Sequence, residues 1–174
     1  QAAGEPNQVS ISVSKQNYTH DMIMRTGAFT VSSITEKADF SLFKRFGFQS
    51  GKETNKFDGF DGWLRGINGV PYITESCNAY ISVKVEKTVD LGSHTLFIGQ
   101  VTDMEVLSED PSVTYAYYQS NIKPKPEKVG TTPKGETVWR CIICGYEYVG
   151  EELPEDFICP WCKHPASDFE KIVR

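Results

Sequence analysis

Apolar and polar positions alternate in several short stretches of residues 1–120, a pattern that is typical of half-buried β-strands. Val9, Ile11 and Val13 alternate with polar neighbours, and the later stretches behave in the same way. The predicted strands lie at 9–13, 29–34, 79–85, 96–106 and 115–118. Asp90-Leu-Gly-Ser93 separates the third from the fourth, so this pair is predicted to form a hairpin.

Two short helices are predicted between these strands. Thr19 is the expected N-cap of a helix over 20–25, and Gly27 follows where a C-terminal glycine belongs. Asp39 is expected to cap a helix over 40–46, which Gly47 would end. Several strands and few helices favour a β-barrel with attached helices. No Gly-x-Gly-x-x-Gly follows a strand, which argues against a Rossmann nucleotide fold.

Composition changes this picture near the C-terminus. The chain has 174 residues, 39% of them hydrophobic and 24% charged, as in an ordinary globular protein. The sequence contains no run of 18 apolar residues, so a transmembrane helix is not expected. The net charge of −5 gives no electrostatic reason to expect nucleic acid or an anionic membrane as a partner. Residues 135–174 carry 8 acidic and 4 basic groups, whereas residues 1–134 carry 15 and 14. The last 40 residues are therefore a distinct acidic block.

A stretch rich in Pro, Gly and Lys separates this block from the rest. Residues 121–136 contain three prolines and four lysines, which favours an extended linker, although a long ordered loop is the alternative. The predicted organisation is a first domain over 1–120, a linker over 121–136 and a small domain over 137–174.

The small domain carries a metal-site signal. Cys141-Ile-Ile-Cys144 is followed after fourteen residues by Cys159-Pro-Trp-Cys162. Four thiolates can close a tetrahedral site, which suits zinc or a single iron. Two disulfides are the alternative, and the lack of a secretion signal argues against them. Spacing alone does not choose between the two metals.

The residues around the cysteines resemble rubredoxin over nearly all of 137–172. Cys-x-x-Cys-Gly-Tyr at 141–146 and Cys-Pro-x-Cys at 159–162 carry the resemblance. It implies one iron ion (Fe2+/Fe3+) held by Cys141, Cys144, Cys159 and Cys162, one-electron transfer, and a small aromatic core. The core residues would be Trp139, Tyr146, Tyr148, Phe157, Trp161 and Phe169. The acidic loop residues around the site are either a docking face for a basic partner or solvated charge.

Polar side chains gather where the first predicted strand leads into the first helix. Segment 10–20 brings hydroxyls, an amide and Lys15 to the unpaired N–H groups of a helix start, which is a phosphate-binding arrangement. Ordinary capping by Thr19, with a solvated Lys15, is the alternative. Together with 45–52, 55–57, 92–99 and 114–118, this segment resembles the flavin reductase-like family over about residues 8–118. That family implies an FMN-binding split β-barrel that usually dimerises.

The same resemblance implies which residues hold FMN. Those expected near the phosphate and ribityl chain are Ser14, Lys15, Asn17, Thr19 and His20, and those of a second cofactor-facing loop are Ser50, Gly51 and Lys56. His94 matches a flavin-side histidine, although Ser93 replaces the family's aspartate; a purely structural hairpin role is the alternative. Cys77 is expected to be a buried strand residue without chemistry. Family members also have an earlier segment, which we expect to be missing from this numbering.

The predicted fold class is therefore mainly β with short helices: an FMN-binding split β-barrel plus a small rubredoxin-like metal-binding domain. The whole chain resembles the high-molecular-weight rubredoxins, in which these two domains are fused. The resemblance implies an FMN-dependent oxidoreductase or electron carrier that passes electrons from FMN to an Fe(Cys)4 centre. The expected acceptor is a flavodiiron protein that reduces oxygen or nitric oxide, and the donor is an NAD(P)H-dependent reductase or NAD(P)H itself. A cytoplasmic homodimer is expected.

Two other functions stay open at this point. One is an NAD(P)H-dependent flavin reductase that supplies reduced FMN, and the other is a binding module built on a zinc ribbon.

Overall fold

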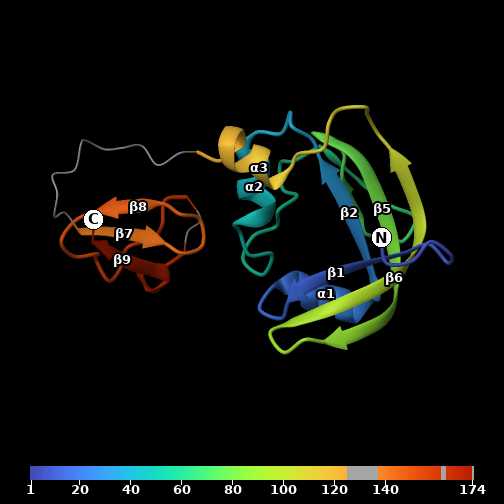
Figure 1. The fold of residues 1–174 in the computed structure, drawn as a ribbon, viewed down its shortest axis with the longest axis horizontal. Coiled ribbons are helices and arrows are strands. Elements are labelled where there is room, and N and C mark those ends of the chain that lie inside the picture. Colours follow the sequence, from blue (N-terminus) through green and yellow to red (C-terminus); the bar gives the residue numbers. More distant parts are fainter. Residues whose placement is uncertain (125–136, 162–163, 174) are drawn as a thin grey trace. The chain divides into compact units, whose positions relative to one another are not determined.

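The computed structural model describes residues 1–124, 137–161 and 164–173, and it is mainly β with short helices, as predicted (Figure 1). The chain divides into two compact units. The first comprises Gln1–Ala38 and Ser50–Ile122, and the second comprises Asp39–Gln49 and Lys123–Arg174. Within the described residues, no helix is both long and apolar enough to cross a membrane.

The first unit is built on one antiparallel sheet of four strands. Its order is β1 (Gln8–Ser14), β6 (His94–Val106), β5 (Cys77–Asp90) and β2 (Ala28–Ile34). Register shifts at Ser82/Val83 and Val85/Lys87 interrupt the β5–β6 ladder. Such bulges bend and twist a strand. The sheet curves into half of a barrel (Figure 1).

Alternating residues of these strands form the core of the first unit. Phe29, Val83 and Phe97 are buried with Ile23 of α1 (Tyr18–Thr26), and the apolar residues of β1 pack against them. Apolar positions that predicted β1, β2 and β5 thus lie in this core, whereas Met104 and Val106 at the end of β6 are exposed. This packing holds α1 against the sheet.

Helix α1 begins earlier than predicted. Asn17, with an extended backbone, is its N-cap, so the prediction of Thr19 is wrong. A turn that joins the Asn17 N–H to the Ser14 carbonyl lets the helix start one residue before Thr19. The other end is as predicted: Gly27 is left-handed at φ 65°, and its N–H donates to the Ile23 carbonyl.

Two further elements of the first unit differ from the prediction. The predicted strand at 115–118 is helical, because Thr114 accepts a hydrogen bond from the Tyr117 N–H and starts α3 (Tyr115–Tyr117), which continues into η1 (Tyr118–Ile122). The hairpin of β3 (Trp63–Arg65) and β4 (Pro71–Ile73) was not predicted, since three residues are too few to show alternation.

The second unit contains α2 (Phe40–Gly47) and a small sheet. Asp39 caps α2 as predicted: its carboxylate accepts from the Ser41 N–H at 2.7 Å. Hydrogen bonding to the Ser41 side chain, and next to the Ser41 N–H, lowers the pKa of Asp39. The sheet has the order β8 (Glu147–Val149), β7 (Thr137–Cys141) and β9 (Phe169–Val173), with the short η2 (Ala166–Asp168) before β9. Most of the predicted linker, at 125–136, lies outside the described residues.

Candidate metal centre and flavin site

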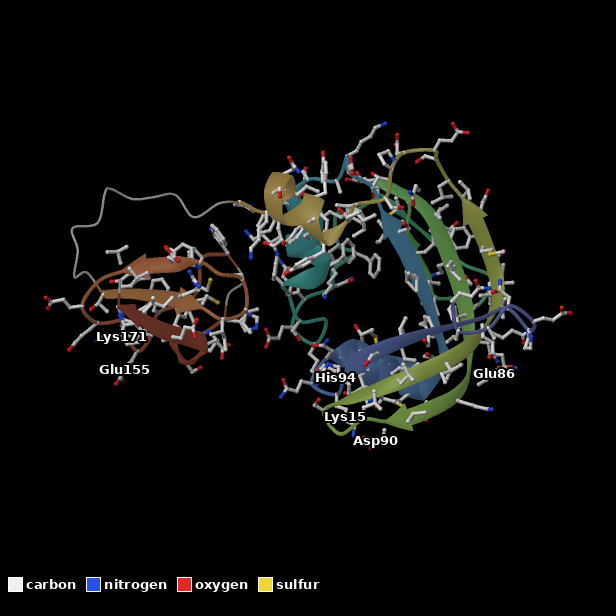
Figure 2. All side chains as sticks on the ribbon, viewed as in Figure 1. Lys15, Glu86, Asp90, His94, Glu155 and Lys171 are labelled. Carbon is white, nitrogen blue, oxygen red and sulfur yellow. The ribbon has the colours of Figure 1, made fainter. Side chains whose placement is uncertain are left out.

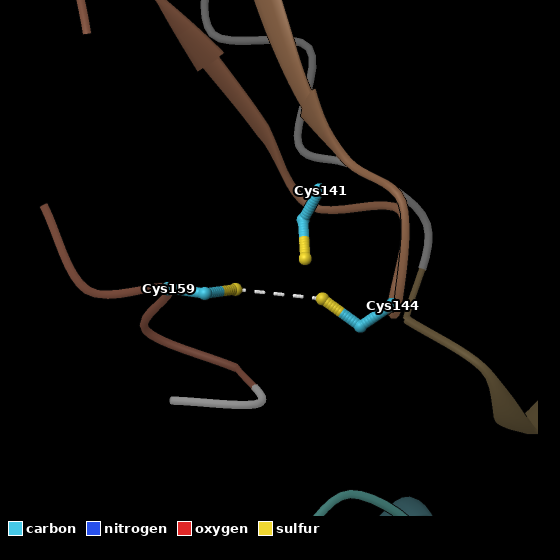
Figure 3. Close-up of side chains that lie close together, drawn as sticks. All are labelled: Cys141, Cys144 and Cys159. Carbon is cyan, nitrogen blue, oxygen red and sulfur yellow. Dashed lines mark hydrogen bonds between the residues drawn. The ribbon is translucent and has the colours of Figure 1, made fainter. Parts of the chain in front are cut away.

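Three of the four predicted metal ligands converge in the second unit. The Sγ atoms of Cys141, Cys144 and Cys159 all lie within 4.8 Å of one another (Figure 3). Their exposed fractions are 0%, 1% and 0%, respectively. Cys162 lies outside the described residues. Three cysteine thiols that converge in the buried interior of the unit form a donor set for a metal ion.

The backbone fixes the first pair of cysteines. Strand β7 ends at Cys141, whose N–H donates to the Tyr146 carbonyl at 2.8 Å. The Gly145 N–H returns to the Cys141 carbonyl at 2.8 Å and closes the turn. Gly145 has φ 79°, a conformation that glycine adopts without strain. The Cys-x-x-Cys-Gly spacing therefore makes a tight turn that aims both thiols at one point.

The spacing of the sulfurs fits a tetrathiolate site better than a disulfide. Cys144 Sγ and Cys159 Sγ are 3.4 Å apart, far beyond the ~2.05 Å of an S–S bond. Metal–sulfur bonds of ~2.3 Å in a tetrahedron place sulfurs ~3.8 Å apart. A metal ion would thus need only a small adjustment of these thiols. Zinc and iron both accept this donor set.

An aromatic cluster surrounds the cysteines, as predicted. Phe157 contacts Phe169, Tyr148 and Tyr146, with ring centroids 5.4, 4.9 and 6.3 Å apart, respectively. Trp161 meets Tyr146 edge-on at 5.5 Å. Trp139 completes the predicted set and also packs against the cysteine cluster. Burial, and to a lesser extent the nearby Cys159, raises the pKa of the Tyr146 hydroxyl.

The first group of predicted FMN residues lies at one end of the first unit's sheet. Ser14 and His94 are register partners across β1 and β6, and the Lys15 N–H donates to the Ser93 carbonyl at 3.0 Å. His94 Nδ1 pairs with the Ser93 hydroxyl at 2.8 Å. Figure 2 shows Lys15 and His94 at this end of the hairpin. Strand pairing thus brings together two segments that are eighty residues apart in the sequence.

Lys15 has a partner that the sequence did not reveal. Its Nζ lies 2.8 Å from both carboxylate oxygens of Asp90, at the start of the hairpin turn (Figure 2). The hydrogen bond from Lys15, with a second from the Gly92 N–H, lowers the pKa of Asp90. Both side chains are exposed. Asp90 therefore holds the ammonium group at the turn of the β5–β6 hairpin.

The side chain of His20, in α1, contacts residues of β6. Its Nε2 is 2.9 Å from the Thr95 hydroxyl, and its Nδ1 is 3.2 Å from the Asp21 carboxylate. The imidazole also meets the buried Phe97 ring at 5.7 Å. The sequence does not reveal the hydrogen bond between His20 and Thr95, although Thr95 directly follows His94. Asn17 and Thr19 stand at the start of the same helix, where the Asn17 side chain makes no capping hydrogen bond.

The second predicted loop lies beside the start of α1. A Cβ atom on Gly51 would stand 3.3 Å from Tyr18 Cδ1 and 4.0 Å from Lys56 Cε, so glycine permits this close approach. The ammonium of Lys52 lies 5.8 Å from the centre of the Tyr18 ring. The hydroxyl of Ser50 accepts from the Lys52 N–H, and burial lowers the pKa of Lys56. Lys52 therefore lies beside the first turn of α1, where its Nζ is also 4.0 Å from the Asp21 carboxylate.

A family model describes most of this unit. The model for the flavin reductase like domain matches residues 1–125. The chain belongs to the flavin reductase-like family. A second model, the rubredoxin-like domain of rubrerythrin, matches residues 139–170. The chain therefore joins an FMN-binding type of fold to a rubredoxin-like metal site.

Two relatives match this chain over most of its length. The high molecular weight rubredoxin of Moorella thermoacetica is 34% identical over 203 residues, covering 99% of this chain and 86% of that protein. This chain is a homologue of that rubredoxin. A ferric-chelate reductase (NAD(P)H) of Archaeoglobus fulgidus is 37% identical over 139 residues, which cover 80% of this chain and 78% of that protein.

The fold also resembles a solved structure. An FMN-binding protein from Thermus thermophilus, with bound p-hydroxybenzaldehyde, matches with a TM-score of 0.53 and 26% identity. The match covers 60% of this chain and 57% of that one, which is less than two thirds of its length. It confirms the predicted split-barrel type of fold.

Proposed function

We propose that this chain is an electron-transfer flavo-rubredoxin. Its flavin reductase-like domain would bind FMN, and its C-terminal domain would bind one iron ion through Cys141, Cys144, Cys159 and Cys162. Electrons would pass from FMN to the iron and then to an external acceptor. The observation that supports this most strongly is the convergence of three buried cysteine sulfurs in a domain fused to a flavin-binding type of fold.

Each unit supplies residues for one centre. Lys15, Asn17 and His20 would hold the FMN phosphate and ribityl chain, together with Ser14, Thr19, Ser50, Gly51, Lys56 and His94. Cys141, Cys144 and Cys159 are buried, so they would shield a bound metal ion from water. When bound, FMN supplies two-electron chemistry that can be divided into single steps, and the Fe(Cys)4 centre supplies a one-electron carrier. The chain's task is to bind, orient and shield the two groups.

The partners belong to the same proposal. A flavodiiron protein that reduces oxygen or nitric oxide would accept the electrons, and NAD(P)H or an NAD(P)H-dependent reductase would supply them. The acidic residues of the metal domain suit a basic patch on the acceptor. We also propose that the protein acts as a cytoplasmic homodimer.

One relative favours a second candidate. The Archaeoglobus protein is named a ferric-chelate reductase that uses NAD(P)H, and it shares most of its length with this chain. In this second candidate function, the chain would oxidise NAD(P)H directly and pass the electrons on without the metal domain. Rapid NAD(P)H turnover that survives loss of the metal would favour this candidate.

Three measurements on the purified protein test the leading proposal. Mass spectrometry of the released cofactor should find FMN, since no pyrophosphate-binding glycine fingerprint accompanies the candidate phosphate site. Metal analysis should find one iron per chain, with the visible absorption of a ferric tetrathiolate. Photoreduction of FMN without oxygen should then bleach that absorption. FAD in place of FMN, zinc in freshly purified protein, or an iron centre that reduced flavin does not bleach would contradict the proposal.

A further inference from the structure

Helix α2 is unusually aromatic for its length. Segment 40–48 contains four phenylalanines, Phe40, Phe43, Phe46 and Phe48, around the buried Leu42. This segment belongs to the flavin reductase-like match in sequence. In the structure, however, it forms a compact unit with the metal-binding residues.

Two of these aromatic side chains pack at the metal centre. Phe48 packs against the buried cluster of Cys141, Cys144 and Cys159. Phe40 meets Trp161 edge-on, with ring centroids 6.3 Å apart, and its ring lies 5.8 Å from that of Phe48. Trp161 stands between Cys159 and Cys162 in the sequence. The α2 aromatics therefore contact residues of the second Cys-x-x-Cys turn and its surroundings.

The charges of the two segments are complementary. The last turn of α2 carries Lys44 and Arg45, and no acidic residue lies within Phe40–Gly47. Residues 135–174 carry 8 acidic and 4 basic groups. A tetrathiolate iron adds one further negative charge when ferric and two when ferrous. Aromatic contact at the centre with opposite charges around it is the usual anatomy of a specific interface.

We propose that α2 is the docking helix for the chain's own metal domain. Phe40 and Phe48 form its apolar centre, and Lys44 and Arg45 attract the acidic domain. Because Gln49 alone separates Phe48 from Ser50, the docking helix continues directly into the loop that is predicted to face FMN. This inference rests on the proposed electron transfer between the two centres and names the surface that makes it efficient.

The kinetic test uses the double variant Phe40→Ala/Phe48→Ala in the full-length protein loaded with FMN and iron. Reduction of the ferric centre by reduced FMN should slow about tenfold or more, as when a well-packed aromatic contact is lost. The rate should not depend on protein concentration in the wild type, because the partner is the same chain. Tyr115→Ala removes an exposed aromatic of the first unit and should leave the rate unchanged.

A second measurement does not depend on electron transfer or on the double variant's folding. Hydrogen exchange of peptide 39–49 should be slow in iron- or zinc-loaded protein and clearly faster in metal-free Cys159→Ser, while peptide 18–26 of α1 should exchange equally in both. Equal exchange of peptide 39–49 in both forms, or an unchanged rate in the folded double variant, would overturn the docking helix. If the wild type shows no transfer at all, the proposed function fails instead, and the exchange experiment still decides whether α2 docks.

Discussion

Single residues differ in how readily the sequence reveals their role. The cysteines were identified from spacing, because two Cys-x-x-Cys turns constrain the chemistry whatever surrounds them. Asp90 was not identified, because its pairing with Lys15 depends on the register of a β-hairpin against β1. Residue type alone favours Thr19 as the N-cap of α1, whereas the turn that begins at Ser14 places Asn17 at that position.

Lys15 is predicted to bind the FMN phosphate. Lys15→Ala should weaken FMN binding by roughly 1–3 kcal/mol, the scale of a hydrogen bond to a charged group. Riboflavin, which lacks the phosphate, should bind equally well to both proteins in a fluorescence titration. Lys87→Ala, in the same hairpin, is the matched control, since its exposed side chain lies outside the candidate site. An equal loss for riboflavin would instead indicate damage to the fold.

Cys77 is predicted to be unreactive while the protein is folded. Burial raises the pKa of its thiol from 9.0 to about 11. The thiolate that reacts with iodoacetamide is therefore scarcer at pH 8 in the folded chain than in the unfolded one. Because the folded pKa is the higher one, this group's effect on stability is favourable below pH 9 and is lost as the pH rises through about 11. Mass spectrometry of alkylated protein, with and without denaturant, would measure the difference, and equal labelling at pH 8 would contradict it.

At the scale of elements, the alternation of apolar and polar residues predicts the long strands, because a short element contains too few residues to show it. Burial alternates along β1 and along the first half of β6, and there the sequence shows the same alternation of apolar or small residues with polar ones. The aromatic segment 115–118 is too short to distinguish a strand from a helix by its pattern, and the cap at Thr114 makes it helical. The sequence also does not reveal that α2 packs with the metal-binding residues. The amphipathic pattern of a helix shows which face is buried, but not which other segment covers that face.

The small domain is predicted to depend on its metal. About forty residues bury too little apolar surface for a secure core, and a metal that binds thiolates couples directly to folding. Cys144→Ser should abolish the iron spectrum and open residues 137–174 to protease, whereas the flavin domain should survive. Cys77→Ser is the control, because that cysteine lies in β5 of the first unit. A metal-free C-terminal domain that resists protease would contradict the prediction.

At the scale of the whole molecule, one chain connects a flavin reductase-like domain to a rubredoxin-like domain, and this covalent connection affects how fast electrons can pass between them. Fusion raises the effective concentration of one centre near the other, so a weak interface suffices for repeated transfer. The composition of residues 121–136 predicts an extended connection, which would let the metal domain dock at α2 and then at an external acceptor. The sequence predicted both domains and their order, but not that residues 39–49 form one unit with the metal-binding residues.

Cutting the connection tests this mechanism. A protease site introduced at 125–136 should, after cleavage and dilution, slow the reduction of iron by reduced FMN and make it depend on concentration, because the effective concentration is lost. Uncleaved protein with the same insertion is the control. Transfer to the external acceptor should also weaken with rising salt, since exposed charges are screened over about 8 Å at physiological ionic strength. If cleavage leaves the rate unchanged and salt has no effect, the domains work without a tether and the acidic residues of 135–174 are only solvated loop charge.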